Sequence, residues 1–149
     1  MTGIWVWPES ILARGAPAVA RRCMDVGVTD FFFLAKGLKG TVSFASALAP
    51  AAGERDLLRE LLDAAHARGG RVHAWFASAH DAAYKAAHPE SGLTHFQRGR
   101  DRDIVSLRDA GYLRYMREVI RDMARRYDID GLHLDYIRYN HLSYGWSEA

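Results

Sequence analysis

The sequence offers little sulfur chemistry, because Cys23 is the single cysteine among its 149 residues. One thiol excludes an internal disulfide and a cysteine-rich metal site, and the helical pattern around it, VARRCMDVG, is typical of a buried, inert cysteine. Long apolar runs are also missing, since none approaches the roughly 20 residues that span a bilayer. The N-terminal MTGIWVW has no basic region followed by an apolar stretch, so no signal peptide is visible.

A charge excess of either sign is lacking too. Lys and Arg number 20 against 18 Asp and Glu, which gives a formal net charge of +2. This balance predicts neither a nucleic-acid partner nor an anionic membrane partner. A glycine-rich phosphate-binding loop is also absent, because the first apolar segment is followed by WPESILARGAP. No cofactor is predicted.

What is present suffices for one domain with a real core, since 49% of the residues are hydrophobic. Segments of period 2 alternate with segments of period 3.6 along the chain. We expect strands at residues 3–7, 29–36, 71–78 and 130–139, and helices at residues 16–27, 54–70 and 110–127. Pro8 is expected to close the first strand. The connection 79–109 exceeds the usual length, which predicts a functional segment.

This alternation predicts parallel strands joined by right-handed crossovers. A TIM-type (β/α) barrel fits better than a doubly wound nucleotide-binding sheet, whose glycine-rich turn is missing. A complete barrel takes about 250 residues, whereas this chain supplies four strands and three helices. We therefore interpret residues 1–149 as the N-terminal half of a (β/α)8 barrel. Its two open edges predict a homo-oligomer or a missing C-terminal half.

Polar and aromatic residues gather where the predicted strands end, which is where such folds bind ligands. The candidate site residues are Trp7, Glu9, Lys36, Trp75, His80, His133, Asp135, Arg138 and Tyr139. Tryptophan suits a carbohydrate substrate, because one face of a sugar ring is apolar while its rim needs hydrogen bonds. Trp5 has the same inward phase but is expected in the core.

Asp135 is the candidate for catalysis. In the segment DGLHLDYIRY, a period of 2 sends Leu132 and Leu134 toward the helices. His133 and Asp135 then face the barrel axis, where a carboxylate is costly unless it is solvated, paired or used. Two interpretations stay open: a catalytic carboxylate oriented by His133, or a structural carboxylate paired with Arg138.

A metal-dependent hydrolase that uses His73, His133 and Asp135 is a further alternative. His73 shares a strand face with Trp75, so two neighbouring strands each place a histidine in one layer. A His-x-Asp pair with one distant histidine is not a common metal signature, however.

The segment YDIDGLHLDYIRY, residues 127–139, resembles the fourth-strand motif of the glycoside-hydrolase-like (GHL) family, also called family 10 glycosyl hydrolase-like proteins. That motif reads Y-x-V/I-D-G-I/L-H-x-D-Y-I/F-R-Y-P and follows a helix, as it does here. GIWVW and RVHAWF are similar to the first and third strands of the family. The sequence departs from the motif at Asn140, which replaces the proline, and from amylase-like relatives at His133, where they carry an arginine.

The resemblance implies a (β/α)8 barrel that acts on polysaccharide, with Asp135 as nucleophile or stabiliser at the end of strand four. It also allows a secreted or cell-envelope location. Hydrolysis needs a second carboxyl group, expected from strands five to eight, because Glu9 is the one carboxylate of this chain near the proposed rim. The chain alone is thus expected to be catalytically incomplete. A non-catalytic carbohydrate-binding or scaffold module is the other alternative.

Overall fold

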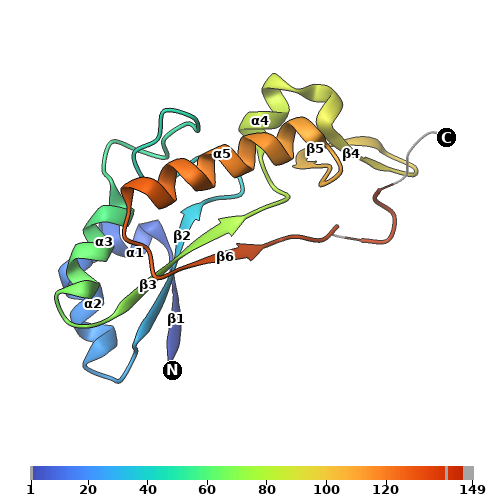
Figure 1. Ribbon diagram of the computed structural model, residues 1–149. Coiled ribbons are helices and arrows are strands. Elements are labelled where there is room, and N and C mark those ends of the chain that lie inside the picture. The colour runs from blue at the N-terminus through green and yellow to red at the C-terminus, as the bar shows by residue number, and fades with distance from the viewer. Residues whose placement is uncertain (1, 140, 146–149) are drawn as a thin grey trace.

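The computed structural model of the protein describes residues 2–139 and 141–145. At its centre lies a sheet of four strands in the order β1-β2-β3-β6, with every neighbouring pair parallel (Figure 1). These strands are β1 (Gly3–Val6), β2 (Asp30–Lys36), β3 (Arg71–Ala77) and β6 (Gly131–Asp135). The predicted parallel sheet with alternating helices is therefore confirmed.

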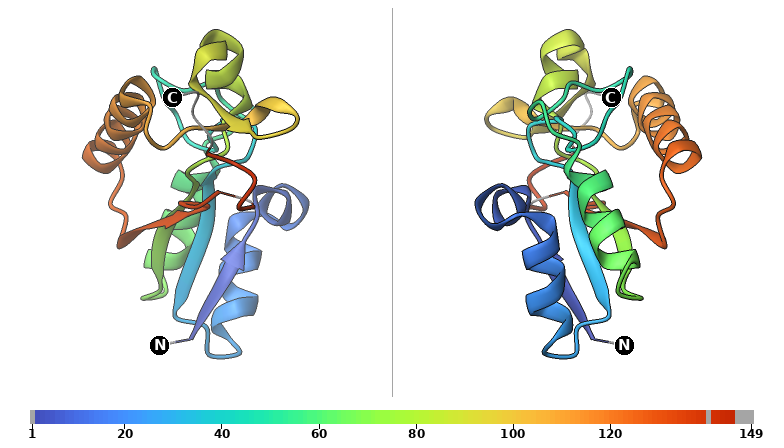
Figure 2. Two further views of the ribbon diagram at one scale, coloured as in Figure 1. Left: turned by 90° about the vertical axis from the view of Figure 1, so that its right-hand side faces the viewer. Right: turned by 90° about the vertical axis from the view of Figure 1, so that its left-hand side faces the viewer.

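Helices cover one face of this sheet. They are α1 (Pro8–Arg14), α2 (Ala16–Met24), α3 (Leu57–His66) and α5 (Ala110–Arg126). In one view α2 and α3 stand in front of the strands, and in the opposite view the strands stand in front (Figure 2). We call these two sides the covered face and the open face. Within the described residues, no helix combines the length and the apolar character needed to cross a membrane.

The covered face holds the main core, because alternate residues of each strand point toward it. In β2 and β3 these are Phe31, Phe33, Val72, Ala74 and Phe76, all fully buried. The leucine stripe of α3, with spacings of three and four residues, packs into the same cluster. Asp56 caps this helix by accepting a hydrogen bond of 3.0 Å from the backbone amide of Arg59.

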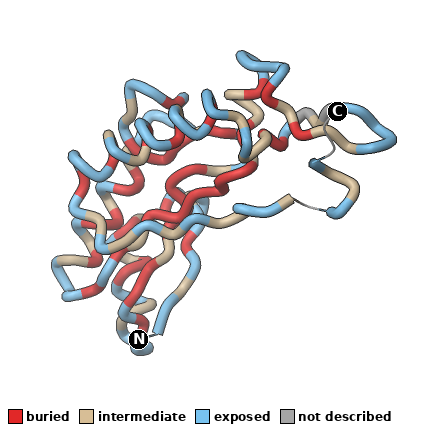
Figure 3. Tube along the Cα trace, turned by 45° about the vertical axis from the view of Figure 1, so that its right-hand side comes forward, coloured by how far each residue is buried: buried red, intermediate tan, exposed pale blue. Residues whose placement is uncertain are grey.

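The outer strand β6 is less buried than its sequence suggests. Leu132 and Leu134 pair in register with Ala74 and Phe76 and so belong to the covered face. Both leucines are nevertheless exposed, at 41% and 44% of their surface. Buried residues concentrate in the inner strands of the sheet (Figure 3). The expectation that helices cover these leucines is wrong, because no helix of residues 2–139 or 141–145 follows β6.

An additional helix, α1, follows the first strand directly. Pro8 does not merely close β1, because it occupies the first turn of α1, where its missing N–H costs nothing. Glu9 adds a favourable negative charge to that first turn. Gly15, with a φ of 79°, separates α1 from α2 and supplies the backbone conformation that other residues disfavour.

The long connection after β3 is folded rather than irregular. It contains α4 (Ala82–Ala87), the 3₁₀ helix η1 (Pro89–Ser91), and the antiparallel strands β4 (Gly92–His95) and β5 (Gly99–Val105). Asp81 caps α4 by accepting a hydrogen bond from the amide of Tyr84 at 2.8 Å. A small second core of Ala79, Leu93 and Ile104 holds the connection together.

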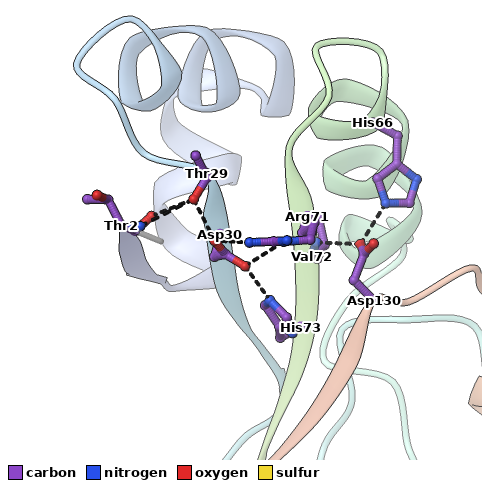
Figure 4. Close-up of polar contacts among 8 residues, drawn as sticks. All are labelled: Thr2, Thr29, Asp30, His66, Arg71, Val72, His73 and Asp130. Atoms are coloured by element: carbon purple, nitrogen blue, oxygen red, sulfur yellow. Dashed lines mark hydrogen bonds and ion pairs between the residues drawn. The ribbon is translucent and has the colours of Figure 1, made fainter.

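The amino ends of the strands carry a polar network (Figure 4). Asp30 is fully buried at the start of β2, and its carboxylate accepts two hydrogen bonds from Arg71, at 2.8 and 2.9 Å. The Thr29 hydroxyl donates to it at 2.6 Å, and Nε2 of His73 lies 2.9 Å away. Bonds from Arg71 and then Thr29 hold the pKa of the Asp30 carboxyl well below its ordinary value. Because ligands bind at the opposite ends of parallel strands, we assign this network a structural role.

Asp130 ties β6 to the rest of the sheet in a similar way. Its carboxylate lies 2.8 Å from Nε2 of His66 and accepts a hydrogen bond of 2.7 Å from the amide of Val72 (Figure 4). Burial acts to raise the pKa of the Asp130 carboxyl, but these hydrogen bonds outweigh it and the pKa is lowered.

We expect the Asp30→Asn substitution to destabilise the protein by about 1.5–3 kcal/mol at pH 7, the range for hydrogen bonds to a charged group. Because the folded state depresses the pKa of Asp30 below 3.8, its stabilising contribution is complete above that value and is lost as the pH falls below it. Urea unfolding of both proteins between pH 7 and pH 3 should show the difference shrinking below about pH 4.

The matched control is Asp25→Asn. Asp25 forms an exposed ion pair with Arg68, at 2.8 Å, which is worth less than about 1 kcal/mol. Equal destabilisation by the two substitutions would contradict the role given to Asp30.

Candidate functional site

The open face carries a cluster of aromatic rings contributed by all four strands. The Trp5 ring lies 4.9 Å from Phe32, 4.7 Å from Trp75 and 4.8 Å from His133, measured between centroids. Trp5 was expected in the core, yet 47% of its surface is exposed. That expectation is wrong because no layer of the described residues covers this side of β1.

Asp135 lies at the carboxyl end of β6, on the same face as these rings. Its Oδ2 accepts a hydrogen bond from the indole N–H of Trp75 at 3.1 Å, and its Oδ1 accepts one from the backbone amide of Tyr136 at 2.7 Å. Tyr136 has a φ of 52°, a left-handed conformation that is uncommon for such a residue. Two donors from different directions therefore fix the orientation of a half-buried carboxylate.

His133 does not orient Asp135. Its ring packs against Trp5 and Phe32 one step lower on the open face, and the indole of Trp75 is the side-chain donor to the carboxylate. Pairing with Arg138 does not occur either: within residues 2–139 and 141–145 no ion pair joins Arg138, which is exposed, to Asp135.

Trp7 lies between the Asp135 region and a surface cleft. Its ring lies 5.1 Å from that of Trp75, and it is 48% exposed. Beyond it opens a cleft of about 680 Å³ between the start of α1, the loop after β2 and the segment before α3, which we call the loop cleft. Glu9 and Trp7 line this cleft together, and Trp7 is the one of the two whose ring is shown beside Trp75.

Lys36 is fully buried and holds the end of β3. Its ammonium donates to the carbonyls of Ala77 and His80 at 3.2 and 2.9 Å and lies 3.1 Å from Oδ2 of Asp81. Burial lowers the pKa of the Lys36 ammonium, and the charge of Asp81 opposes that effect. With these three partners and no exposed surface, Lys36 stabilises the carboxyl end of β3 and is not accessible to a ligand.

His80 is part of the folded connection after β3, and Tyr139, which follows β6, packs against it. The His80 ring lies 5.0 Å from the ring of Tyr136, and among the described residues its buried Nε2 has no hydrogen-bond partner. Tyr139 packs against the small second core rather than beside Trp75. Asn140, the departure from the GHL motif, lies outside the described residues.

Sequence reasoning missed two residues that shape the site. Asp81 is the buried partner of Lys36, and the hydroxyl of Tyr112 donates to the carbonyl of Ser78 at 2.6 Å, just beyond the end of β3. The signal for Asp81 was its position as a helix cap three residues before Tyr84. No local signal identifies Tyr112, because its partner is 34 residues away.

The alternative metal site is not formed by the described residues. No group of three His, Cys, Asp or Glu side chains among them is arranged to hold an ion. His73 is bonded to Asp30 in the network at the other end of the strands, so it is not available to join His133 and Asp135.

We expect the Gly40→Ala substitution to disrupt the support beneath the site. Gly40 has a φ of 81°, and a Cβ there would lie 1.9 Å from Oδ1 of Asp81. Displacing Asp81 leaves the Lys36 ammonium buried without its counter-charge, which costs about 3–5 kcal/mol. Urea unfolding measures this loss.

Gly53→Ala is the control, because Gly53 has no atom within 4 Å of a new Cβ and does not have a left-handed backbone. A similar, small effect of both substitutions would show that the Lys36–Asp81 pair is not the constraint described here.

Comparison with known proteins adds to this geometry. No model of a known protein family matches the sequence, and no curated protein matches it. Solved structures do match. α-L-Fucosidase isoenzyme 2 from Paenibacillus thiaminolyticus is similar over 78% of this chain, with a TM-score of 0.67 and 23% identity. A noncanonic maltogenic α-amylase from Thermotoga neapolitana is similar over 89% of it, with a TM-score of 0.59 and 14% identity. Glycoside hydrolases contain this fold.

The shares of the matched chains differ widely. This chain spans 19% of the fucosidase and 38% of the amylase. It spans 81% of a hypothetical protein from Ruminiclostridium thermocellum ATCC 27405, which is similar over 97% of this chain with a TM-score of 0.79 and 14% identity. The TM-scores establish a shared fold, and at identities this low they establish the fold alone. That fold is a mixed α/β arrangement around a parallel sheet.

Proposed function

We propose that this chain is part of a glycoside hydrolase in which Asp135 is the nucleophile or the carboxylate that stabilises the transition state. One observation carries the proposal: the Asp135 carboxylate is held by the Trp75 indole and the Tyr136 amide at the carboxyl edge of a parallel sheet, beside exposed tryptophans. Ligands of such sheets bind at this edge. The fold shared with fucosidases and an amylase supports the same reaction class.

The tryptophans suit a sugar ring. Trp5 and Trp7 are each about half exposed, while Trp75 beneath them is buried and ties them to Asp135. An indole face binds the apolar C–H face of a pyranose, and neighbouring polar groups bond its hydroxyls. A sugar stacked here would present its anomeric carbon near the carboxylate.

The chemistry needs a second carboxyl group that protonates the leaving oxygen. In a retaining enzyme it lies about 5–5.5 Å from the first, and farther in an inverting enzyme. Both oxygens of Asp135 already face Trp75 and Tyr136 on its own side of the sheet. We infer that the second group faces Asp135 across the open face, from the other half of a barrel.

This inference requires that the chain form half of a (β/α)8 barrel. Half of a barrel would expose its inner face and its two outer strands. The open face, the exposed leucines of β6 and the exposed Trp5 of β1 agree with this expectation. The missing half is either further chain or a second copy, because a two-fold axis parallel to the strands would place β6 of each copy beside β1 of the other.

We expect residues 1–149, expressed alone, to self-associate through these edges, because an unpaired apolar strand edge pairs with other chains. The substitution Leu134→Lys should reduce the associated fraction by placing a charge on the edge of β6. Light scattering coupled to size exclusion measures both proteins. Leu113→Lys, at a leucine that is 49% exposed on α5, is the control. A monomeric wild-type chain would contradict this prediction.

The GHL family assignment rests on the motif at residues 127–139 and stays a prediction. The names of the structural neighbours suggest the first substrates to test, α-L-fucosides and α-glucans.

The decisive experiment is Asp135→Asn in the intact gene product, which preserves the size of the side chain and removes its charge. We expect hydrolysis of 4-nitrophenyl α-L-fucoside or of maltooligosaccharides to fall by about 10³-fold or more, as for a residue that reacts directly. Asp128→Asn is the control, because Asp128 is an exposed carboxylate of the same motif. Undiminished hydrolysis in Asp135→Asn would exclude the proposed role.

A second candidate is a carbohydrate-binding module without catalysis. It is favoured by one observation: Trp5 and Trp7 are each about half exposed, and stacking a sugar ring on them needs no second carboxyl group. Calorimetric titration with oligosaccharides separates the candidates, since binding without turnover by the intact protein supports the module.

A further inference from the structure

The loop cleft lies next to the Asp135 region, and apart from Trp7 its residues have no part in the mechanism above. Trp7 belongs to both, because it lines the cleft and its ring lies 5.1 Å from that of Trp75. Leu34 also lines the cleft and pairs in register with Trp75, on the open face of the sheet. The cleft and the Asp135 region are therefore parts of one continuous surface.

The lining of the loop cleft combines apolar walls with hydrogen-bonding groups. Leu12, Leu38 and Leu57 contribute apolar surface to the lining. Thr41 and Ser43, which carry hydroxyl groups, belong to the same lining. Such a mixture matches a sugar, whose ring faces are apolar and whose rim is covered with hydroxyls. The volume of about 680 Å³ lies within the range of about 300–1,000 Å³ for sites of drug-sized ligands, the size class of a disaccharide.

The charges of the lining disfavour an acidic ligand. Glu9 and Glu54 contribute two carboxylates, and Lys39 contributes one ammonium. Arg55 also lines the cleft, but its guanidinium is already paired with Glu60 through bonds of 2.9 and 2.6 Å. A uronate or a sulfated sugar would meet net negative charge, whereas carboxylates accept hydrogen bonds well from neutral hydroxyls.

We propose that the loop cleft binds further units of a neutral oligosaccharide, whose chain runs from Asp135 over Trp7 into the cleft. The proposal rests on the proposed function for the identity of the unit at Asp135. It makes the protein specific for an oligosaccharide instead of a single sugar, because the cleft adds contact surface beyond the reacting unit.

The test is calorimetric titration of the intact protein with maltotetraose, cellotetraose, xylotetraose and 2′-fucosyllactose. Each is compared with its non-reducing terminal monosaccharide, and tetragalacturonic acid serves as the acidic probe. We expect one neutral oligosaccharide to bind at least about ten-fold more tightly than its monosaccharide, the order of one stacking contact with its burial.

The variant Ala52→Trp fills the cleft, because Ala52 is exposed on its lining. We expect it to remove the ten-fold gain and to leave monosaccharide binding unchanged. Ala124→Trp, at an exposed alanine on α5, is the matched control and should keep the gain. Thermal unfolding followed by circular dichroism confirms that both variants fold.

Three results would overturn the proposal: preference for tetragalacturonic acid, a gain that survives Ala52→Trp, or no binding of any neutral oligosaccharide. Two measurements on Asp135→Asn, its rate of hydrolysis and its oligosaccharide titration, separate this proposal from the proposed function. If that variant hydrolyses normally but the oligosaccharide gain is present and sensitive to Ala52→Trp, the catalytic role is wrong and the cleft is still a sugar site.

Discussion

Parallel strands present apolar side chains on both faces, and such sheets are normally covered on both. In this protein, α2, α3 and α5 cover one face, while the other carries Trp5, His133 and Asp135. Within the described residues, the outer edges of β1 and β6 have no partner strand. The proposed function follows from that asymmetry. The uncovered face is where a substrate and a second half of a barrel would both have to lie, which is why the proposed reaction and the proposed assembly depend on each other.

The site itself is held by buried polar groups rather than by its exposed residues. Lys36 and Tyr112 donate hydrogen bonds to carbonyls at and just beyond the end of β3, and Asp81 pairs with the Lys36 ammonium. These contacts fix the strand that carries Trp75. Trp75 in turn donates to Asp135 across the β3–β6 pair. A buried ion pair contributes little net stability when its desolvation is counted. Its effect here is to define one geometry for the carboxyl ends of the strands.

Much of the framework was accessible from the sequence, and particular residues show why the rest was not. The leucine stripe of α3 and the aromatic-rich apolar run of β2 predicted their elements, because each is a local pattern. The helix α1 was missed because Pro8 fits both the end of a strand and the first turn of a helix. The partner of Asp135 was misjudged as His133, since the nearest residue in sequence was favoured over Trp75, which is 60 positions away.

The sequence by itself determined the order of the four sheet strands with α2, α3 and α5, their parallel arrangement, and the face of β6 on which Asp135 lies. The last of these follows because a strand alternates its side chains whatever surrounds it. Tertiary structure alone decided which side chains are covered and which groups meet. The exposure of Leu134 and Trp5, the burial of Lys36, and the bond between Trp75 and Asp135 all depend on the neighbours that distant segments bring. Contacts of that kind arise from packing across the sheet, which no local pattern of residues records.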